Sequence, residues 1–370
     1  MKALSLYAGP AAREHILREG LSPAHVRTIP AAAGGPKGLI LGALDRFIFG
    51  RWLAASAQPV DLVGASIGAW RMATACLDEP EAALARLEHD YIHQHYELKP
   101  GEKLPPAHLV SEEFGRNLRS FYGGRVAQVL GHPRYRLHIV TSRGRHLLGR
   151  EHRLGTPLGY LGAFLSNSVR RRAMGAWLER VVFSTAVGAG PQARIAPLPF
   201  ATGDYRTRQR VLDEENFYAA LQASCSIPFV LQAVHDIPGG PPGAYWDGGI
   251  TDYHLHLNYA GVADAAQRPG LVLYPHFQRA VVPGWLDKPL KWRHRSTHFL
   301  NNMLVLAPRP EWVQSLPNRK LPDRSDFTRY GNELAARVQV WTQAVAMSRQ
   351  LAEEFEAWLD KPDLAQVQPL

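Results

Sequence analysis

The residues best suited to chemistry lie in a short segment, Gly64-Ala65-Ser66-Ile67-Gly68, which matches the pattern G-x-S-x-G. An apolar run at 60–64 precedes it and a helical pattern from Ile67 to about Leu77 follows, so Ser66 is expected in a tight turn between strand and helix. That context is typical of a nucleophile elbow, in which glycines permit the turn and the helix N-terminus favours developing negative charge. The alternative is that Ser66 only caps the helix.

A glycine loop, Gly34-Gly35-Pro36-Lys37-Gly38, lies upstream between a candidate strand at 26–33 and a helical pattern at 39–49. Such a loop can direct backbone N–H groups at an anion or oxyanion. Neither a P-loop, which needs Ser or Thr at the position of Leu39, nor a G-x-G-x-x-G dinucleotide fingerprint fits. An oxyanion hole or a plain turn remains.

A third segment, Trp246-Asp247-Gly248-Gly249, holds an acidic residue in a glycine turn. Asp247 could act as a base. Asp-Gly is also a strong hairpin signal, and taken alone the turn is the favoured interpretation.

The surrounding pattern alternates short apolar runs with helical periodicity, which predicts a mostly parallel sheet with helices on both faces. The expected strands lie at 26–33, 60–64, 135–140, 181–184 and 271–274. One long helix is predicted from about Ser325 to Asp360, ended by Pro362. We therefore expect a catalytic domain at 1–275, with its motifs at 26–258, and a mostly helical C-terminal extension at 276–370 packed on it.

The composition is that of a globular enzyme, with 46% hydrophobic and 20% charged residues among 370. No apolar run approaches the ~20 residues of a membrane-spanning helix, and the apolar stretch near the N-terminus is too short for a signal peptide. A cytoplasmic location is expected. Cys76 and Cys225 have no metal-binding spacing and are expected to be buried free thiols. No metal or other cofactor is predicted, and no pattern specifies an oligomeric state.

A net charge of +9 and a pI near 9.6 favour anionic partners. Apolar residues between 158 and 178 accompany arginines at 170–172, and a second basic, aromatic patch covers 288–295. The first could be an amphipathic helix at an anionic membrane surface, or a lid or core helix with a solvated basic end, which is slightly favoured. No nucleic-acid module accompanies these patches, so no nucleic acid is expected as a partner.

Taken in order, these motifs resemble the patatin-like phospholipase family. The family's D-G-G-G-x-[RK]-G motif is similar to residues 32–38, its G-x-S-x-G to 64–68 and its D-G-[AG] to 247–249. A fourth segment, Ala223-Ser224-Cys225-Ser226-Ile227-Pro228-Phe229, resembles A-S-x-A-x-P-x-x-F. The resemblance covers residues 26 to about 258.

The resemblance implies a three-layer α/β fold and a lipid acyl hydrolase with a Ser–Asp dyad, and therefore a lipid or ester substrate. Ser66 would be the nucleophile and Asp247 its base, with oxyanion donors among Gly34, Gly35 and Lys37. The remaining motif glycines are Gly38, Gly64, Gly68, Gly248 and Gly249. Two features depart from the family pattern: Ala32 and Ala33 replace Asp and Gly, and Pro36 has no N–H to donate.

Two other functions stay open. An α/β-hydrolase triad would need a histidine after the acid, and the histidines in suitable positions are His254, His256, His276, His294 and His298. A noncatalytic lipid- or granule-surface protein could also keep this fold.

Overall fold

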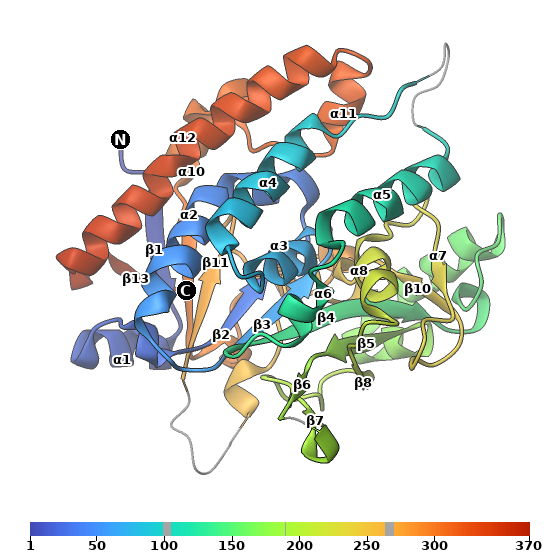
Figure 1. Cartoon of the computed structure of the whole chain (residues 1–370), viewed down its shortest axis with the longest axis horizontal. Coiled ribbons are helices and arrows are strands. Elements are labelled where there is room, and N and C mark those ends of the chain that lie inside the picture. The colour runs from blue at the N-terminus through green and yellow to red at the C-terminus, as the bar shows by residue number, and fades with distance from the viewer. Residues whose placement is uncertain (99–104, 189, 263–269) are drawn as a thin grey trace.

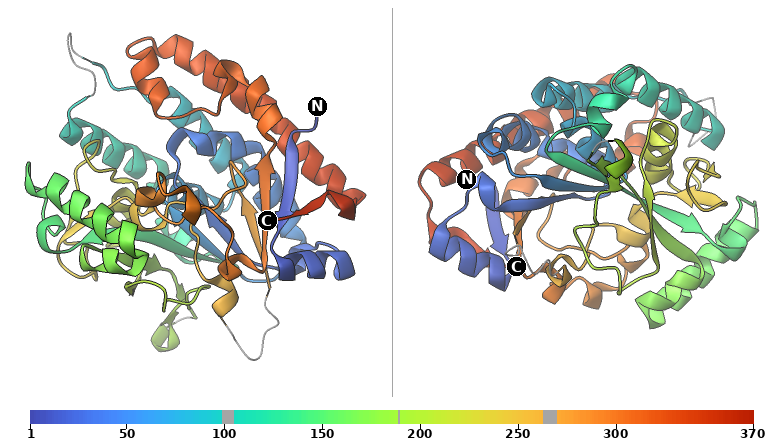
Figure 2. Two further views of the ribbon diagram at one scale, coloured as in Figure 1. Left: turned by 180° about the vertical axis from the view of Figure 1, so that it is seen from behind. Right: turned by 60° about the horizontal axis from the view of Figure 1, so that its bottom comes forward.

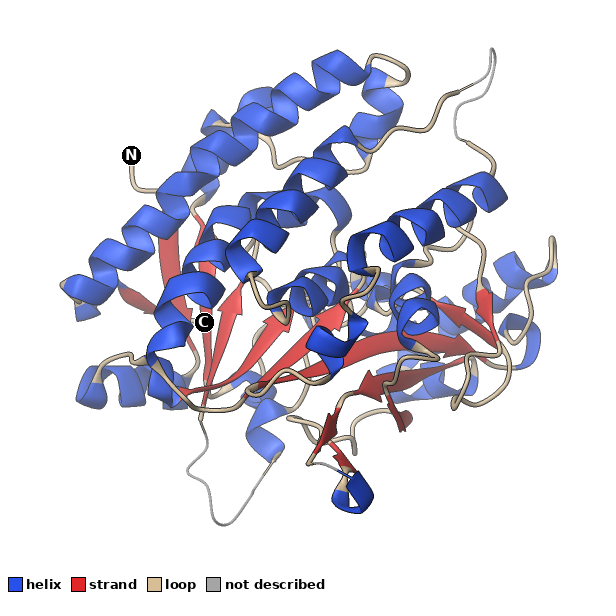
Figure 3. Cartoon of the chain, viewed as in Figure 1, coloured by secondary structure: helices blue, strands red, loops and turns tan. Residues whose placement is uncertain are grey.

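The computed structural model describes residues 1–98, 105–188, 190–262 and 270–370. Its strands form a layer between two sets of helices (Figure 3). The strands of the main sheet are β1 (Leu4–Ala8), β2 (Val26–Ala31), β3 (Val60–Ala65), β4 (Tyr135–Gly144), β5 (Leu178–Ser184), β8 (Thr207–Val211), β9 (Val234–His235), β10 (Ala244–Trp246), β11 (Leu271–Pro275), β12 (Met303–Pro308) and β13 (Val367–Pro369). A two-stranded ribbon is formed by β6 (Ala186–Val187) and β7 (Arg194–Ile195).

The central five strands, β12-β11-β2-β3-β4, are all parallel to one another. Antiparallel strands extend this centre on both sides: β1 pairs with β12, and β5 and β10 pair with β4. All residues of β11 and β12 are buried, as expected for strands covered on both faces. The prediction of a mostly parallel sheet between helices is confirmed.

The helices divide between the two faces of this sheet, with α2, α3, α4, α5 and α12 over one face and α1 and α7 over the other (Figures 1 and 2). Their bounds are α1 (Pro10–Glu19), α2 (Gly42–Phe47), α3 (Ile67–Ala75), α4 (Pro80–His93), α5 (Ala107–Tyr122), α6 (Val126–Leu130), α7 (Gly155–Val169), α8 (Phe217–Cys225), α9 (Gly249–Asp252), α10 (Pro310–Ser315), α11 (Ser325–Tyr330) and α12 (Leu334–Asp360). Every residue of α3 is buried, so the helix after Ser66 is fixed on all sides.

Two helix predictions need correction. The predicted helix at 39–49 is a 3₁₀ segment at Gly35–Leu41, followed by α2 and a π turn at Ile48–Trp52, because Gly38 and Gly42 are poor helix formers. The predicted helix from Ser325 to Asp360 is broken into α11 and α12 at Gly331, whose φ of 50° suits glycine.

The chain after residue 275 does more than pack on the core. β12 lies inside the sheet between β1 and β11, while α12 packs on α2 and α4. Helical periodicity in this region did not predict that it also supplies strands.

Candidate active site

Ser66 lies in a strained turn between β3 and α3. Its φ of 56° and ψ of −131° are rare for a residue with a side chain. The two motif glycines make the turn possible: a Cβ on Gly64 would lie 2.3 Å from the Ala69 Cα, and one on Gly68 would lie 1.9 Å from the Ala31 carbonyl oxygen. Sequence reasoning placed the turn correctly because these two glycines are sterically required.

The length of β4 brings Asp247 to Ser66. β3 pairs with the first part of β4, up to Ala65 opposite Val140. β10 pairs antiparallel with the next part, with Trp246 opposite Ser142. The two strands therefore end facing each other along β4, and the residues that follow them, Ser66 and Asp247, meet.

The Ser66 hydroxyl donates a hydrogen bond to Asp247 Oδ2 at 2.6 Å, and both residues are buried. The second carboxylate oxygen, Oδ1, accepts the Gly249 N–H at 2.7 Å. Burial raises the pKa of Asp247 above its ordinary value, opposed chiefly by the positive charge of Arg324 and then by the Ser66 hydrogen bond. A base of raised pKa is better matched to a hydroxyl near neutral pH.

Ser224 positions the elbow, a role that sequence analysis did not assign. Its hydroxyl accepts the Ser66 backbone N–H at 3.0 Å and donates to the Val140 carbonyl at 2.7 Å. It lies in the fourth motif segment, so the signal was present, but the spacing did not reveal which atoms it would contact.

The glycine loop lies beside both Ser66 and Asp247. Gly35 borders the same cavity as Ser66, while Gly34 borders a second cavity together with Asp247. Gly35 has a φ of 56°, and no acceptor within the described residues takes its N–H or that of Gly34. In the 3₁₀ helix that Gly34 caps, the Lys37 N–H is the first to be used in a hydrogen bond within the helix. Gly34 and Gly35 are therefore the better donors to an oxyanion.

The remaining motif glycines allow close packing around the pair. A Cβ on Gly248 would lie 2.1 Å from the Val140 carbonyl oxygen, and one on Gly249 would lie 2.5 Å from the Ala33 Cβ. Gly38 approaches Ile67 at the start of α3. These contacts hold the three motif segments together.

Comparison with known proteins identifies the family. The family model described as patatin-like phospholipase matches residues 32–254, which is more than half of the chain. The chain belongs to the patatin-like phospholipase family. No curated protein matches it significantly. The matched segment of this patatin-like chain holds Ser66, Asp247 and the glycine loop, and the family is one of lipid acyl hydrolases.

Two adjoining cavities of the patatin-like site meet at Ser66 and Asp247. The first, of about 190 Å³, is mainly apolar, and its lining includes Trp70, Phe114, Val230, Leu231 and Phe327. The second, of about 230 Å³, is more polar, and its lining includes Asp247, Lys37 and Lys288. Arg324 and Ile227 border both. An ester at Ser66 could thus place an acyl chain on one side and its alcohol on the other.

Cys225 borders the apolar cavity beside Ser66. Burial raises the pKa of its thiol well above the ordinary value, so the sulfur is protonated at neutral pH and a poor nucleophile. Both Cys225 and Cys76 are buried and free, as the sequence predicted.

The five candidate triad histidines are held by other groups. Within the described residues, none of them hydrogen-bonds Ser66 or Asp247. Four contact backbone carbonyl groups instead: His254 that of Ala280, His256 that of Val281, His276 that of Gln278 and His294 that of Asp287. The His298 ring packs edge to face with Phe299. Burial lowers the pKa of His256 to about 4 and that of His276 to about 3, so both are neutral.

Single replacement of each of these histidines by glutamine is therefore expected to change kcat by less than about tenfold. Steady-state kinetics on a soluble ester checks this, with thermal melting to identify variants that lose the fold. A loss of about 10³ or more at one histidine with normal melting would indicate a triad instead.

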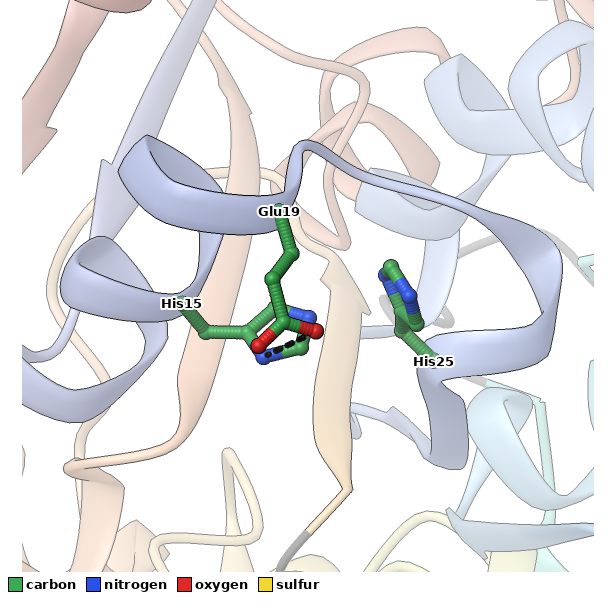
Figure 4. A group of neighbouring side chains, drawn as sticks. All are labelled: His15, Glu19 and His25. Atoms are coloured by element: carbon green, nitrogen blue, oxygen red, sulfur yellow. Dashed lines mark ion pairs between the residues drawn. The ribbon is translucent and has the colours of Figure 1, made fainter.

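One group of side chains outside this centre could hold a metal ion. His15, Glu19 and His25 offer ligand atoms within 4.8 Å of one another on α1 and the turn before β2 (Figure 4). The Glu19 carboxylate is already bonded by Arg18 at 2.8 Å, and the rings of His15 and His25 pack edge to face. The group has no part in the Ser66 geometry, and no metal was predicted from the sequence.

Proposed function

We propose that the protein is a serine acyl-ester hydrolase of lipids in which Ser66 and Asp247 form a catalytic dyad. The observation that carries this proposal is the 2.6 Å hydrogen bond from the hydroxyl of Ser66, whose backbone is strained, to the buried Asp247 carboxylate. No histidine is required, because Asp247 can accept the proton directly.

The reaction follows from these positions. Asp247 Oδ2 takes the hydroxyl proton as Ser66 Oγ attacks the ester carbonyl, and the oxyanion is stabilised by the N–H groups of Gly34 and Gly35, with Lys37 the less suitable donor. The protonated Asp247 then gives its proton to the departing alcohol, leaving acyl-Ser66. Asp247 next deprotonates a water molecule that attacks the acyl group, and the proton returns to Ser66 as the fatty acid leaves.

The apolar cavity supports a lipid rather than a small polar ester as the substrate. Its aromatic and aliphatic lining would bury several methylene groups, each contributing about 0.8 kcal/mol. Specificity should therefore rise with acyl length until the cavity is full.

Active-site labelling tests the proposal. A fluorophosphonate should form one adduct, and peptide mass spectrometry should place it on Ser66. Turnover of nitrophenyl esters should accompany labelling. Absence of both an adduct and turnover in folded protein would favour the noncatalytic surface protein.

We also propose that α7 contacts an anionic membrane surface. No helix in the described part of the chain has the length and apolarity to traverse a bilayer. The inner face of α7 is buried, yet its outer face is also apolar. Four of its residues, and Leu154 just before the helix, are more than half exposed: Leu154, Leu158, Leu161, Leu165 and Val169. Apolarity on both faces is unusual for a water-exposed helix.

The flanks of α7 are basic, and its position suits delivery of lipid. Exposed arginines stand before and after the helix, namely Arg150, Arg153, Arg170 and Arg172, and no ion pair is found for them in the described residues. Phe229, which is 60% exposed, packs 6.1 Å from the Tyr160 ring of α7. Its neighbours Ile227 and Val230 border the apolar cavity, so the exposed ridge lies close to the route into the site.

Replacing Leu158, Leu161 and Leu165 together by serine should weaken binding to phosphatidylglycerol vesicles at least about 30-fold, because their side chains would no longer enter the lipid interface. Vesicle co-sedimentation checks this, and hydrolysis of a soluble ester should persist. Leu17→Ser, on the exposed side of α1, is the matched control. Equal binding by the triple variant and the control would contradict membrane contact through α7.

A further inference from the structure

The polar cavity beside Asp247 gathers three basic side chains from distant parts of the chain. Lys37 comes from the glycine loop, Lys288 from the segment after β11, and Arg324 from the residue preceding α11. Lys288 and Arg324 lie beyond the segment 32–254 that matches the family model. They are therefore features of this chain that the family resemblance does not supply.

These three cations differ from two buried arginines, Arg71 and Arg180, which have carboxylate partners. Arg71 pairs with Asp45 at 2.7 Å, and Arg180 pairs with Asp252 at 2.6 Å. In the described residues, no carboxylate lies within ion-pair distance of Lys37, Lys288 or Arg324.

The acidic residues that border the cavity offset only part of its positive charge, with Asp247 acted on by the charges of Arg324 and Lys288. Asp323 is held by Lys320 at 2.9 Å, and Asp247 is engaged by Ser66. The lysines rest instead on aromatic rings, with Lys288 Nζ 4.0 Å from the Tyr253 centroid and Lys37 Nζ 5.3 Å from that of Phe277.

Uncompensated positive charge in this cavity is costly to the free protein. Burial, and then the nearby charges of Arg324 and Lys37, lower the pKa of Lys288 to about 8. Burial also lowers the pKa of Lys37. An anion bound among the three would relieve both the desolvation and the mutual repulsion.

The position of Arg324 indicates which part of a substrate would carry that anion. It borders both cavities, and its Nε lies 3.3 Å from the place where a Cβ on Gly35 would be. An acyl chain in the apolar cavity would put the ester at Ser66 and the alcohol portion among the cations. A guanidinium can hold phosphate through two parallel hydrogen bonds, with lysines as added point charges.

We propose that Arg324 and Lys288, together with Lys37, form a subsite for a phosphate carried on the alcohol side of the scissile ester. A phospholipid is the substrate that the family's description already names. The subsite adds the residues of this chain that would select such a phosphorylated alcohol ester over a neutral glyceride. This inference rests on the proposed hydrolase function and specifies its substrate class.

The test is a ratio of specificities measured on monomeric substrates. We compare kcat/KM for dioctanoyl phosphatidate with kcat/KM for dioctanoylglycerol in the wild type, in Arg324→Gln and in Lys288→Met. The ratio is the readout because Arg324 also influences Asp247, an effect that both substrates share and that cancels. Arg329→Gln, an exposed arginine of α11 outside both cavities, is the matched control.

The wild type should prefer phosphatidate, and each variant should lower the ratio by about 10- to 100-fold, the usual effect of losing one hydrogen bond between charged groups. The control should keep the wild-type ratio. A ratio that stays within threefold in both variants would overturn the subsite while leaving the hydrolase proposal intact. Absence of turnover of either substrate and of any Ser66 adduct would instead reject the hydrolase.

Inorganic phosphate separates a lipid headgroup from free phosphate as the ligand. Competitive inhibition of nitrophenyl butyrate hydrolysis that weakens in Arg324→Gln, together with the phosphatidate preference, supports the proposal. The same inhibition without that preference would overturn the lipid assignment, because the subsite would then bind the free ion.

Discussion

Replacing Ser66 by alanine is expected to lower ester hydrolysis by at least about 10⁴-fold, since the attacking oxygen is removed and no acyl-enzyme can form. Fluorophosphonate labelling should disappear with it. Loss of the 2.6 Å hydrogen bond leaves the buried Asp247 carboxylate without its hydroxyl donor, which costs about 1–3 kcal/mol. The melting temperature should therefore fall by a few degrees without loss of the fold.

Ser168→Ala is a suitable control for this change. Among the residues that the structure describes, the Ser168 hydroxyl bonds only the Phe164 carbonyl, so its removal should leave turnover unaltered. Persistent labelling in folded Ser66→Ala would place the nucleophile elsewhere, and Cys225, whose thiol borders the apolar cavity beside Ser66, would be the next residue to replace.

Asp247→Asn is expected to lower kcat by about 10²–10⁴-fold, because asparagine keeps the shape of the side chain but cannot accept the Ser66 proton. Its amide oxygen can still accept the Gly249 N–H, so the turn after β10 should survive. In the wild type, kcat/KM should rise with pH along one acid limb. The midpoint of that limb should lie above the ordinary carboxyl pKa, since burial raises the pKa of Asp247.

The same substitution has a predicted sign for stability. Folding raises the pKa of Asp247, so between its unfolded and folded pKa values this carboxyl binds more protons in the native state than in the unfolded state. The free energy of unfolding therefore falls as the pH rises through that range. The neutral asparagine side chain would carry no such penalty. Asp247→Asn should thus melt at or above the wild-type temperature at neutral pH, and this advantage should vanish in acid.

Asp236 provides the matched control, because it performs only the turn role. Its carboxylate accepts the Gly243 N–H at 2.7 Å in an exposed turn. Asp236→Asn should leave the pH–rate profile unchanged. Wild-type turnover by Asp247→Asn would exclude Asp247 as the base and return it to the same turn role.

The sequence predicted those parts of the site that local sterics dictate. The elbow at Ser66 needs Gly64 and Gly68, and these leave a recognisable pattern. Arg324 and Lys288 leave none, because their approach to Asp247 depends on how segments far apart in the chain pack. The role of Ser224 was hidden for a similar reason: its partners, Ser66 and Val140, belong to other segments of the chain.

The same distinction explains the fold. The strands before the glycine loop and before Ser66 were predicted, since each is an apolar run followed by a turn and a helical pattern. β1 and β12 were not predicted, although both are apolar, because their pairing joins residues about 300 positions apart and has no local signature. The predicted C-terminal helix divides at Gly331, because the φ of 50° at this glycine lies outside the helical range.

The place of β12 between β1 and β11 has a consequence for biosynthesis. At about 5–20 residues per second, β1 leaves the ribosome roughly 15–60 seconds before its antiparallel partner is made. For most of that interval the elbow sequence exists, but the sheet that orients it lacks an interior strand. A protein cut to the family-matching residues 32–254 would stay incomplete permanently, lacking β1, β2, β11, β12 and β13. If the chain is the hydrolase proposed above, its activity is expected to arise only late in translation, and an unfinished chain is not expected to act on lipid.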